Sequence, residues 1–174
     1  MELNAKTGSG KILVAYFSWS GNAGTLAKQI AEATGGDLFE IKTVTAYPDI
    51  YDECTKAAKR ELDSNARPAI TGKVADMAQY SAVFLCYPNW WDTIPMAVFT
   101  FLESYDFSGK TIYPLVTHGG SRFGHSLDAI RKLCPKAVLG DGLDVSVFSK
   151  NPNSAPKVSA ANKNVSAWLR KLGM

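Results

Sequence analysis

The sequence predicts an α/β protein built on a doubly wound parallel sheet, because strand patterns alternate with helix patterns along the chain. Short apolar runs that suit strands buried on both faces occur at residues 11–17, 81–87 and 111–117. Helical patterns separate these runs, and neighbouring parallel strands need such crossover connections. We therefore expect a three-layer sandwich with helices on both faces of one sheet.

The first part of the chain is expected to form a β-α-β unit. Residues 11–17 (KILVAYF) predict the first strand, and residues 25–33 (TLAKQIAEA) place their apolar side chains on one face of a helix. Gly35 and Gly36 then give a stop signal. Residues 37–42 (DLFEIK) alternate polar and apolar side chains, which is typical of a strand near a sheet edge.

The rest of the chain repeats this rhythm after a longer connection. Its charged segment 49–65 is expected to be an ordinary connecting helix, and the Pro- and Ser-containing patch 149–156 a surface loop. The further strands are expected at 81–87, 111–117 and, more weakly, 137–147, and the further helices at 95–104, 126–133 and 158–172.

Length and composition favour a single domain. With 174 residues, of which 46% are hydrophobic and 20% charged, we expect residues 11–174 to form one domain behind an N-terminal extension, residues 1–10. No apolar run approaches the roughly 20 residues of a membrane-spanning helix, so no membrane span is expected. The polar start of the chain lacks the apolar middle of a signal peptide, which predicts a cytoplasmic location unless an export signal has been removed.

Charge and cysteine usage argue against two other classes of function. The formal net charge is +3, but the basic residues are scattered, so we expect no binding of nucleic acid. Cys54, Cys86 and Cys134 lack the paired spacing of a zinc site or a redox CxxC motif. We expect free thiols, buried or partly buried, and no metal site.

Candidate functional residues gather in the loops that follow three of the strands. The carboxyl ends of parallel strands lie at one edge of a sheet, where ligands bind in this architecture. The first loop offers hydroxyl and amide side chains, and its glycine lets backbone amides turn toward a ligand where a helix starts. Its residues are Ser18, Trp19, Ser20, Gly21, Asn22 and Ala23.

This first loop lacks the lysine and the GxxxxGK[ST] spacing of a nucleotide-hydrolysing P-loop, and it also lacks the GxGxxG turn of dinucleotide folds. A phosphate that is transferred needs a cation or a metal beside it, whereas a phosphate that serves as a handle can be held by amides and hydroxyls. The loop therefore indicates a retained phosphomonoester. The alternative is ordinary turn and helix-cap chemistry, which uses the same residue types.

The loop after the third strand carries adjacent tryptophans. Trp90 and Trp91 follow Pro88 and Asn89, which favour a turn, so at most one indole points easily into the core. The other is expected to face the cleft and to stack on a flat ring.

The loop after the fourth strand has glycines that let backbone amides approach a polar ring edge closely. Its residues are Thr117, His118, Gly119, Gly120 and Ser121. His118 has the chemistry of a general acid, but no carboxylate is obviously placed in the sequence to orient it, so we expect a positioning role.

Three stretches, YFSWSGNAGTLA, YPNWW and THGGS, resemble the flavodoxin-like family, and the resemblance spans nearly the whole chain. It implies a five-stranded sheet in the order 2-1-3-4-5, FMN bound without a covalent link, and redox chemistry at the exposed flavin edge. It also implies that the first loop holds the phosphate, with Ala23 where relatives usually have Thr, and that the other two loops flank the flavin ring. Because the flavin itself accepts electrons or hydride, no catalytic side chain is predicted.

Two functions fit these predictions. One is a flavodoxin that carries electrons between a reductase and an acceptor protein, and the other is an enzyme that passes hydride from NAD(P)H through FMN to a quinone or similar small acceptor. We expect the carrier, as a monomer or homodimer, although flavodoxins that dock basic reductases are typically acidic and this chain is mildly basic. Phospho-acceptor domains and cysteine phosphatases fit badly, because the required carboxylates and the Cys-x5-Arg spacing are missing.

Overall fold

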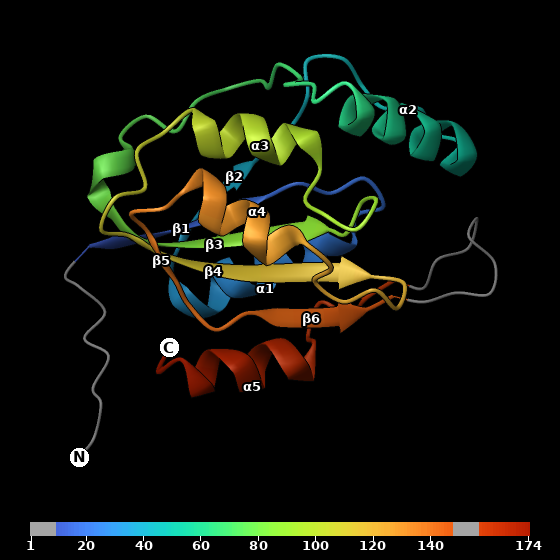
Figure 1. Cartoon of the computed structure of the whole chain (residues 1–174). Coiled ribbons are helices and arrows are strands. Elements are labelled where there is room, and N and C mark those ends of the chain that lie inside the picture. Colours follow the sequence, from blue (N-terminus) through green and yellow to red (C-terminus); the bar gives the residue numbers. More distant parts are fainter. Residues whose placement is uncertain (1–9, 148–156) are drawn as a thin grey trace.

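One parallel sheet lies between two layers of helices in the computed structural model, which describes residues 10–147 and 157–174 (Figure 1). This arrangement confirms the predicted α/β class. The predicted loop at 149–156, and the predicted N-terminal extension apart from its last residue, lie outside the described residues.

The sheet confirms the expected strand order. Its main path is β2-β1-β3-β4-β5, every neighbouring pair is parallel, and an added strand, β6, also pairs with β4. The strands are β1 (Lys11–Tyr16), β2 (Asp37–Glu40), β3 (Tyr80–Pro88), β4 (Thr111–His118), β5 (Val138–Leu139) and β6 (Leu143–Ser146).

The added strand arises because the single strand predicted at 137–147 is broken into two, and that prediction was wrong. β5 pairs with the first residues of β4 and β6 pairs with its last residues. At the break, a β-carbon on Gly140 would lie 2.5 Å from the ring of Tyr113, and one on Gly142 would lie 3.0 Å from Pro114. Pro114 has no N–H to donate to a neighbouring strand, so the ladder is easily interrupted there.

The helices follow the predicted order with shifted ends. α1 starts at Asn22, earlier than predicted, because Gly21 makes the left-handed turn that opens it. α5 starts later than predicted, at Lys163, where the side chain of Asn162 caps it. The helices are α1 (Asn22–Thr34), α2 (Tyr51–Asp63), α3 (Met96–Glu103), α4 (Ser126–Leu133) and α5 (Lys163–Lys171), with a short 3-10 helix η1 (Met77–Gln79).

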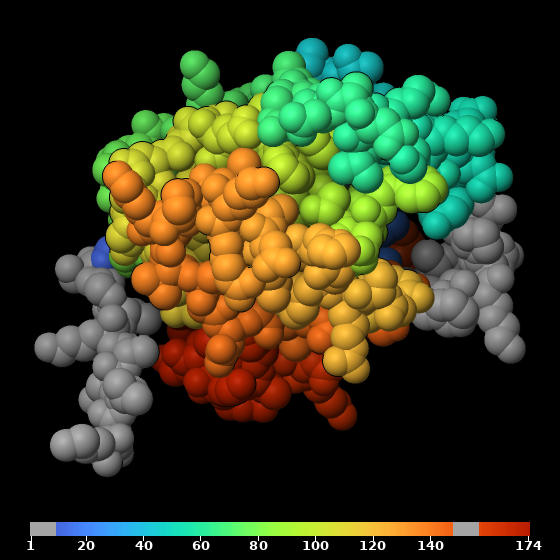
Figure 2. Space-filling view, viewed as in Figure 1, coloured from blue at the N-terminus to red at the C-terminus, as the bar shows by residue number. Residues whose placement is uncertain are grey.

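Each face of the sheet has its own hydrophobic core. Phe101 of α3 and Ile130 of α4 are buried with Leu85 of β3 on one face, and Figure 2 shows α3 and α4 covering this face. Leu26 of α1 and Leu169 of α5 are buried with inward residues of the sheet on the other face. Removal of this apolar surface from water holds the sheet rigid between the layers.

This packing leaves the carboxyl edge of the sheet to the loops. In Figure 1, α2 lies beside that edge, at the end toward which the strand arrows point. No helix in the described part of the chain is long and apolar enough to cross a membrane.

Candidate functional site

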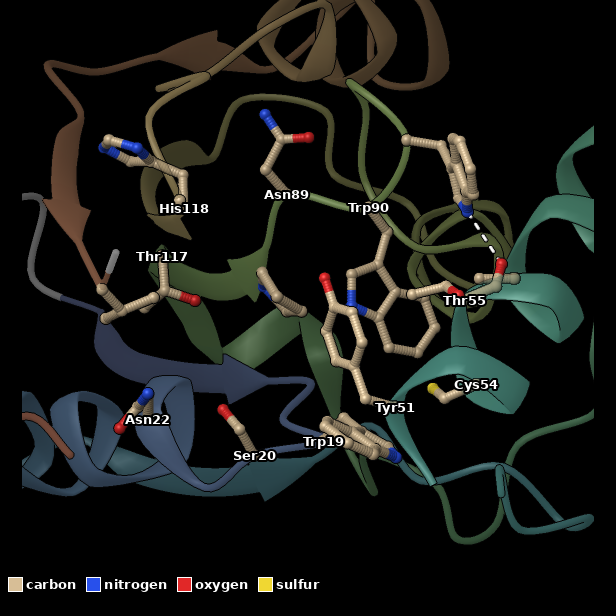
Figure 3. Close-up of a pocket in the computed structure, with 15 residues that line it drawn as sticks. Trp19, Ser20, Asn22, Tyr51, Cys54, Thr55, Asn89, Trp90, Thr117 and His118 are labelled. Atoms are coloured by element: carbon tan, nitrogen blue, oxygen red, sulfur yellow. Dashed lines mark hydrogen bonds between the residues drawn. The ribbon is translucent and has the colours of Figure 1, made fainter. Parts of the chain in front are cut away.

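A cavity of about 550 Å³ opens at the carboxyl edge of the sheet (Figure 3). Its walls come from the loops after β1, β3 and β4, which the sequence predicted to meet, and also from α2. The predicted residues that line it are Trp19, Ser20, Asn22, Pro88, Asn89, Trp90, Trp91, Thr117, His118 and Gly119. Other predicted residues, namely Ser18, Gly21, Ala23, Gly120 and Ser121, belong to the same loops but do not line the cavity.

The first loop turns sharply at Gly21, whose φ of +92° favours glycine, and α1 begins at the next residue. The first helical hydrogen bond runs from the Thr25 amide to the Gly21 carbonyl at 2.9 Å, so the amides of Ala23 and Gly24 have no acceptor within the helix. No side chain in the described part of the chain caps this end of α1, and its first turn has no acidic residue. The loop therefore presents backbone donors at the positive end of a helix.

The hydroxyl of Ser18 adds a further donor beside these amides. Its Oγ atom is buried and has no hydrogen-bond partner among the described residues. A buried hydroxyl without a partner is costly, and a ligand oxygen would satisfy it. The Thr25 hydroxyl, in contrast, is engaged within α1 with the Gly21 carbonyl at 3.0 Å, so it does not replace the hydroxyl that Ala23 lacks.

The second loop is a tight turn that sends its two tryptophans in different directions. Trp90 and Thr93 exchange backbone hydrogen bonds at 3.0 and 3.2 Å, while Trp91 and Asp92 have φ values of 51° and 68°. Positive φ at both central residues defines a type I′ turn, which usually favours Asn or Gly. Two non-glycine residues are therefore held here in a strained conformation.

Trp90 is the tryptophan that packs on the core, and Trp91 lies toward solvent. The Trp90 ring meets the rings of Phe17 and Tyr47 edge-on, each at a centroid distance of 5.0 Å. Trp91 is 49% exposed, and its Nε1 donates to the carbonyl of Thr55 in α2 at 2.9 Å (dashed line in Figure 3). Both nevertheless line the cavity.

The third loop is held by His118, and the fold places beside this histidine a carboxylate that was not obvious in the sequence. Its Nε2 lies 2.8 Å from Oδ1 of Asp144, and its Nδ1 accepts a hydrogen bond from the Gly120 amide at 2.9 Å. Because an amide can only donate, the imidazole is neutral and its proton is on Nε2. Asp144 reaches this position because β6 pairs with the end of β4.

Beyond His118 the loop leaves room at two glycines. A β-carbon built on Gly119 or Gly120 would meet no heavy atom of the described residues within 4 Å, and Gly120 has a φ of +129°. This open backbone fits the close approach of a ligand edge.

Hydrogen bonds also tie the second and third loops together. The Asn89 amide donates to the Thr117 carbonyl at 2.8 Å, and the Asn89 side chain donates to the Arg122 carbonyl at 2.9 Å. At the rim, the His125 amide donates to the Asp92 carbonyl at 2.7 Å, and their side chains approach to 2.6 Å. The two loops thus form one framework.

The fourth wall comes from α2, where the sequence predicted only an ordinary connecting helix. Tyr51, Cys54, Thr55 and Ala58 of this helix line the cavity. Cys54 and Ala58 are its buried residues and lie one turn apart, a spacing that signals one packed face on an otherwise charged helix. Trp19 joins this wall to the first loop, because its ring meets that of Tyr51 edge-on and its Nε1 donates to the carbonyl of Pro48, just before α2, at 2.9 Å.

The cavity holds a thiol, but its chemistry is not that of a nucleophile. All three cysteines are buried free thiols, as expected. Burial raises the pKa of Cys54 to about 11, and the negative charge of Glu61 adds to this effect. Within residues 10–147 and 157–174, no cluster of three or more His, Cys, Asp or Glu side chains could hold a metal ion.

The chain matches a known protein family over most of its length. Residues 11–165 match the family described as Flavodoxin. The chain belongs to the flavodoxin family. No curated protein matches it.

Solved structures agree with this assignment to the flavodoxin family. Two proteins described as flavoproteins, from Bacteroides eggerthii and Bacteroides uniformis, are each 31% identical to this chain. The matches cover 95% and 92% of this chain and 99% and 98% of theirs, with TM-scores of 0.77 and 0.75. A flavoprotein from Lactobacillus acidophilus, solved in complex with FMN, shares the fold at 18% identity, with 78% and 93% coverage and a TM-score of 0.68.

Proposed function

We propose that this protein binds FMN and carries electrons between redox proteins. Membership of the flavodoxin family supports a flavin cofactor, and the FMN complex of the Lactobacillus flavoprotein supports FMN in particular. The observation that carries the proposal is the buried Oγ of Ser18 beside the start of α1, since residues 10–147 and 157–174 provide neither a partner for this hydroxyl nor a side-chain cap for the helix. A phosphate oxygen is the acceptor that both features lack.

The first loop would hold the FMN phosphate through the Ser18 and Ser20 hydroxyls and the amides after Gly21. The remaining cavity suits the ring system, since its volume lies in the usual range for small-molecule sites, about 300–1,000 Å³. Aromatic side chains supply flat apolar walls, and the open backbone at Gly119 supplies an amide donor for a polar edge. Residues that line the cavity and would flank the ring are Trp19, Pro88, Asn89, Trp90, Trp91, Thr117, His118 and Gly119.

When bound, FMN would supply the redox chemistry, and this chain would bind it, orient it and shield it from water. Trp90 would contribute a wall fixed by its contacts with Phe17 and Tyr47. His118, neutral and held by Asp144, would fix the backbone beside the ring without exchanging a proton.

Exchange of electrons with another protein is supported by aromatic residues that reach from the cavity to the surface. Tyr51 is 39% exposed and Trp91 is 49% exposed, and both line the cavity. An apolar rim of this kind suits brief docking of a partner close to the flavin edge.

A second candidate function is hydride transfer from NAD(P)H through FMN to a small acceptor. The wall formed by α2 favours it, because Tyr51 and Thr55 enclose space that the three predicted loops alone would leave open. A planar substrate could stack there beside the flavin.

Spectroscopy and reduction kinetics test both parts of the proposal. The purified protein should be yellow, or its apoprotein should bind added FMN and quench the flavin fluorescence. A colourless protein that takes up no FMN would refute the proposed function. Anaerobic mixing with NADPH or NADH then separates the candidates: reduction only through a partner reductase supports the carrier, whereas rapid reduction by the nucleotide alone supports the enzyme.

A further inference from the structure

A lysine from the C-terminal part of the chain lies at the first loop, although the loop's own sequence contains none. The Lys157 ammonium donates a hydrogen bond to the Ser20 carbonyl, from a residue 137 positions away in sequence. A β-carbon built on Gly21 would lie 4.0 Å from the same ammonium. The fold therefore supplies the cation that the loop lacks.

Contacts with α1 hold the segment that carries this lysine. The Val158 amide, next in the chain, donates to Oδ1 of Asn22 at 3.1 Å. Further along, the side chain of Gln29 donates to the Asn162 carbonyl at 2.9 Å and accepts from the Asn162 amide at 3.0 Å. The helix whose first turn forms the proposed phosphate site thus also positions Lys157.

The electrostatics of this arrangement are unfavourable without an anion. The start of a helix carries about half a positive charge, so a cation beside it is repelled. The first turn of α1 has no acidic residue, and no carboxylate of residues 10–147 or 157–174 forms an ion pair with Lys157. The ammonium, the helix start and the Ser18 hydroxyl all offer positive charge or a hydrogen to the same small region.

We propose that Lys157 completes the phosphate site and makes this protein select the phosphorylated flavin over the same flavin without its phosphate. This inference rests on the proposed binding of FMN. A phosphomonoester carries about −1.5 to −2 charges at pH 7, more than one helix start can balance. Lys157 supplies a full positive charge next to it, whereas riboflavin, which lacks the phosphate, gains nothing from this residue.

Titration of the apoprotein with FMN and with riboflavin tests the role of Lys157. Lys157→Ala should raise the Kd for FMN about tenfold, as expected for loss of one hydrogen bond to a charged group, and leave the Kd for riboflavin unchanged. Lys157→Arg, which keeps the charge, should retain most of the affinity for FMN. Lys163→Ala removes an exposed lysine from the start of α5 with the same change in net charge, and it should bind both flavins as the wild type does.

Salt and stability measurements add two independent readouts. The affinity of the wild type for FMN should fall more steeply with ionic strength than that of Lys157→Ala, because an exposed charge is screened by salt. The apoprotein of the variant should unfold at nearly the same temperature, because relief of the repulsion from the helix start offsets loss of the hydrogen bond to the Ser20 carbonyl.

Three results would overturn the inference. The first is equal FMN affinity in the wild type and in Lys157→Ala. The second is an equal loss of affinity for both flavins, and the third is a lower unfolding temperature of the variant. The second and third results would indicate a merely structural role for Lys157. In all three cases the wild type still binds FMN, so the proposed function stands. A wild type that binds neither flavin instead refutes the proposed function itself, and the inference falls with it.

Discussion

The Nε2 atom of His118 lies 2.8 Å from Oδ1 of Asp144, and this pair fixes the loop that follows β4. The other ring nitrogen, Nδ1, accepts a hydrogen bond from the Gly120 amide, so hydrogen bonds hold both nitrogens of the ring. Asp144 is only partly buried, whereas the His118 side chain is almost fully buried. The carboxylate is thus a surface residue that sets the orientation of a group inside the cavity.

We expect Asp144→Ala to weaken FMN binding about fivefold, the equivalent of one ordinary hydrogen bond, because the imidazole loses its anchor. Asp144→Asn retains an oxygen that can accept from Nε2 and should bind FMN nearly as the wild type does. Fluorescence titration gives the Kd values. Asp141→Ala, which removes the carboxylate near Lys171, is the control for charge. Equal affinity in Asp144→Ala and the wild type would contradict a positioning role.

Ser18→Ala should have opposite effects on stability and on binding. Removal of a buried hydroxyl without a partner should stabilise the apoprotein by about 1 kcal/mol, and the same change should weaken FMN binding about tenfold. Thermal unfolding and flavin titration measure the two effects. Ser104→Ala, whose hydroxyl is already bonded to the Thr100 carbonyl, should not stabilise the protein. An apoprotein destabilised by Ser18→Ala would show that its hydroxyl is satisfied internally.

Trp91→Phe should loosen α2 while it keeps an aromatic ring at the cavity. The variant loses the hydrogen bond from Nε1 to Thr55, so we expect amide exchange in α2 to accelerate about fivefold. Hydrogen exchange followed by mass spectrometry would report this. Trp168→Phe, which loses an indole hydrogen bond to the Asp141 carbonyl, controls for the loss of such a bond outside α2. An unchanged rate of amide exchange in α2 would show that the hydrogen bond from Trp91 does not stabilise this helix.

Glu61 gives a pH dependence whose sign can be stated. Burial raises its pKa, and the hydrogen bond from Tyr47 only partly offsets this. A raised pKa in the folded state means that the stability contributed by Glu61 is present below the pKa of the unfolded chain and is lost as pH rises through the folded value.

Glu61→Gln removes the stability loss that accompanies ionisation of Glu61, and it keeps an oxygen that accepts from the Tyr47 hydroxyl. The unfolding temperature of this variant, relative to the wild type, should therefore rise between about pH 4 and pH 7. Melting of the apoproteins across this range measures the difference. Glu32→Gln, at an exposed position of α1, should give a difference that does not vary in this way. A constant offset for Glu61→Gln would refute the assigned effect of burial.

Much of this fold could be predicted from local patterns. The apolar runs of β1, β3 and β4 are continuous because these strands are buried on both faces, and such runs are visible without knowledge of their neighbours. The meeting of the three loops could be predicted from the fold class, because the carboxyl ends of parallel strands lie at one edge of the sheet.

The remaining features of the site depend on contacts between residues that are far apart in the sequence, and local patterns do not reveal such contacts. Asp144 meets His118 only because β6 extends the sheet beside β4, and Lys157 meets Ser20 only because its segment packs along α1. The role of α2 was hidden for a different reason. Its charged composition describes its exposed face, whereas the few residues that line the cavity form too short a pattern to stand out.

A crystal structure of the protein with bound FMN would show directly whether the first loop holds the flavin phosphate. We expect the phosphate at the start of α1, within hydrogen-bond distance of the Ser18 hydroxyl and the amides after Gly21, with the ring system against Trp90. A phosphate in solvent, or a flavin bound elsewhere on the chain while the Ser18 hydroxyl stays without a partner, would contradict it.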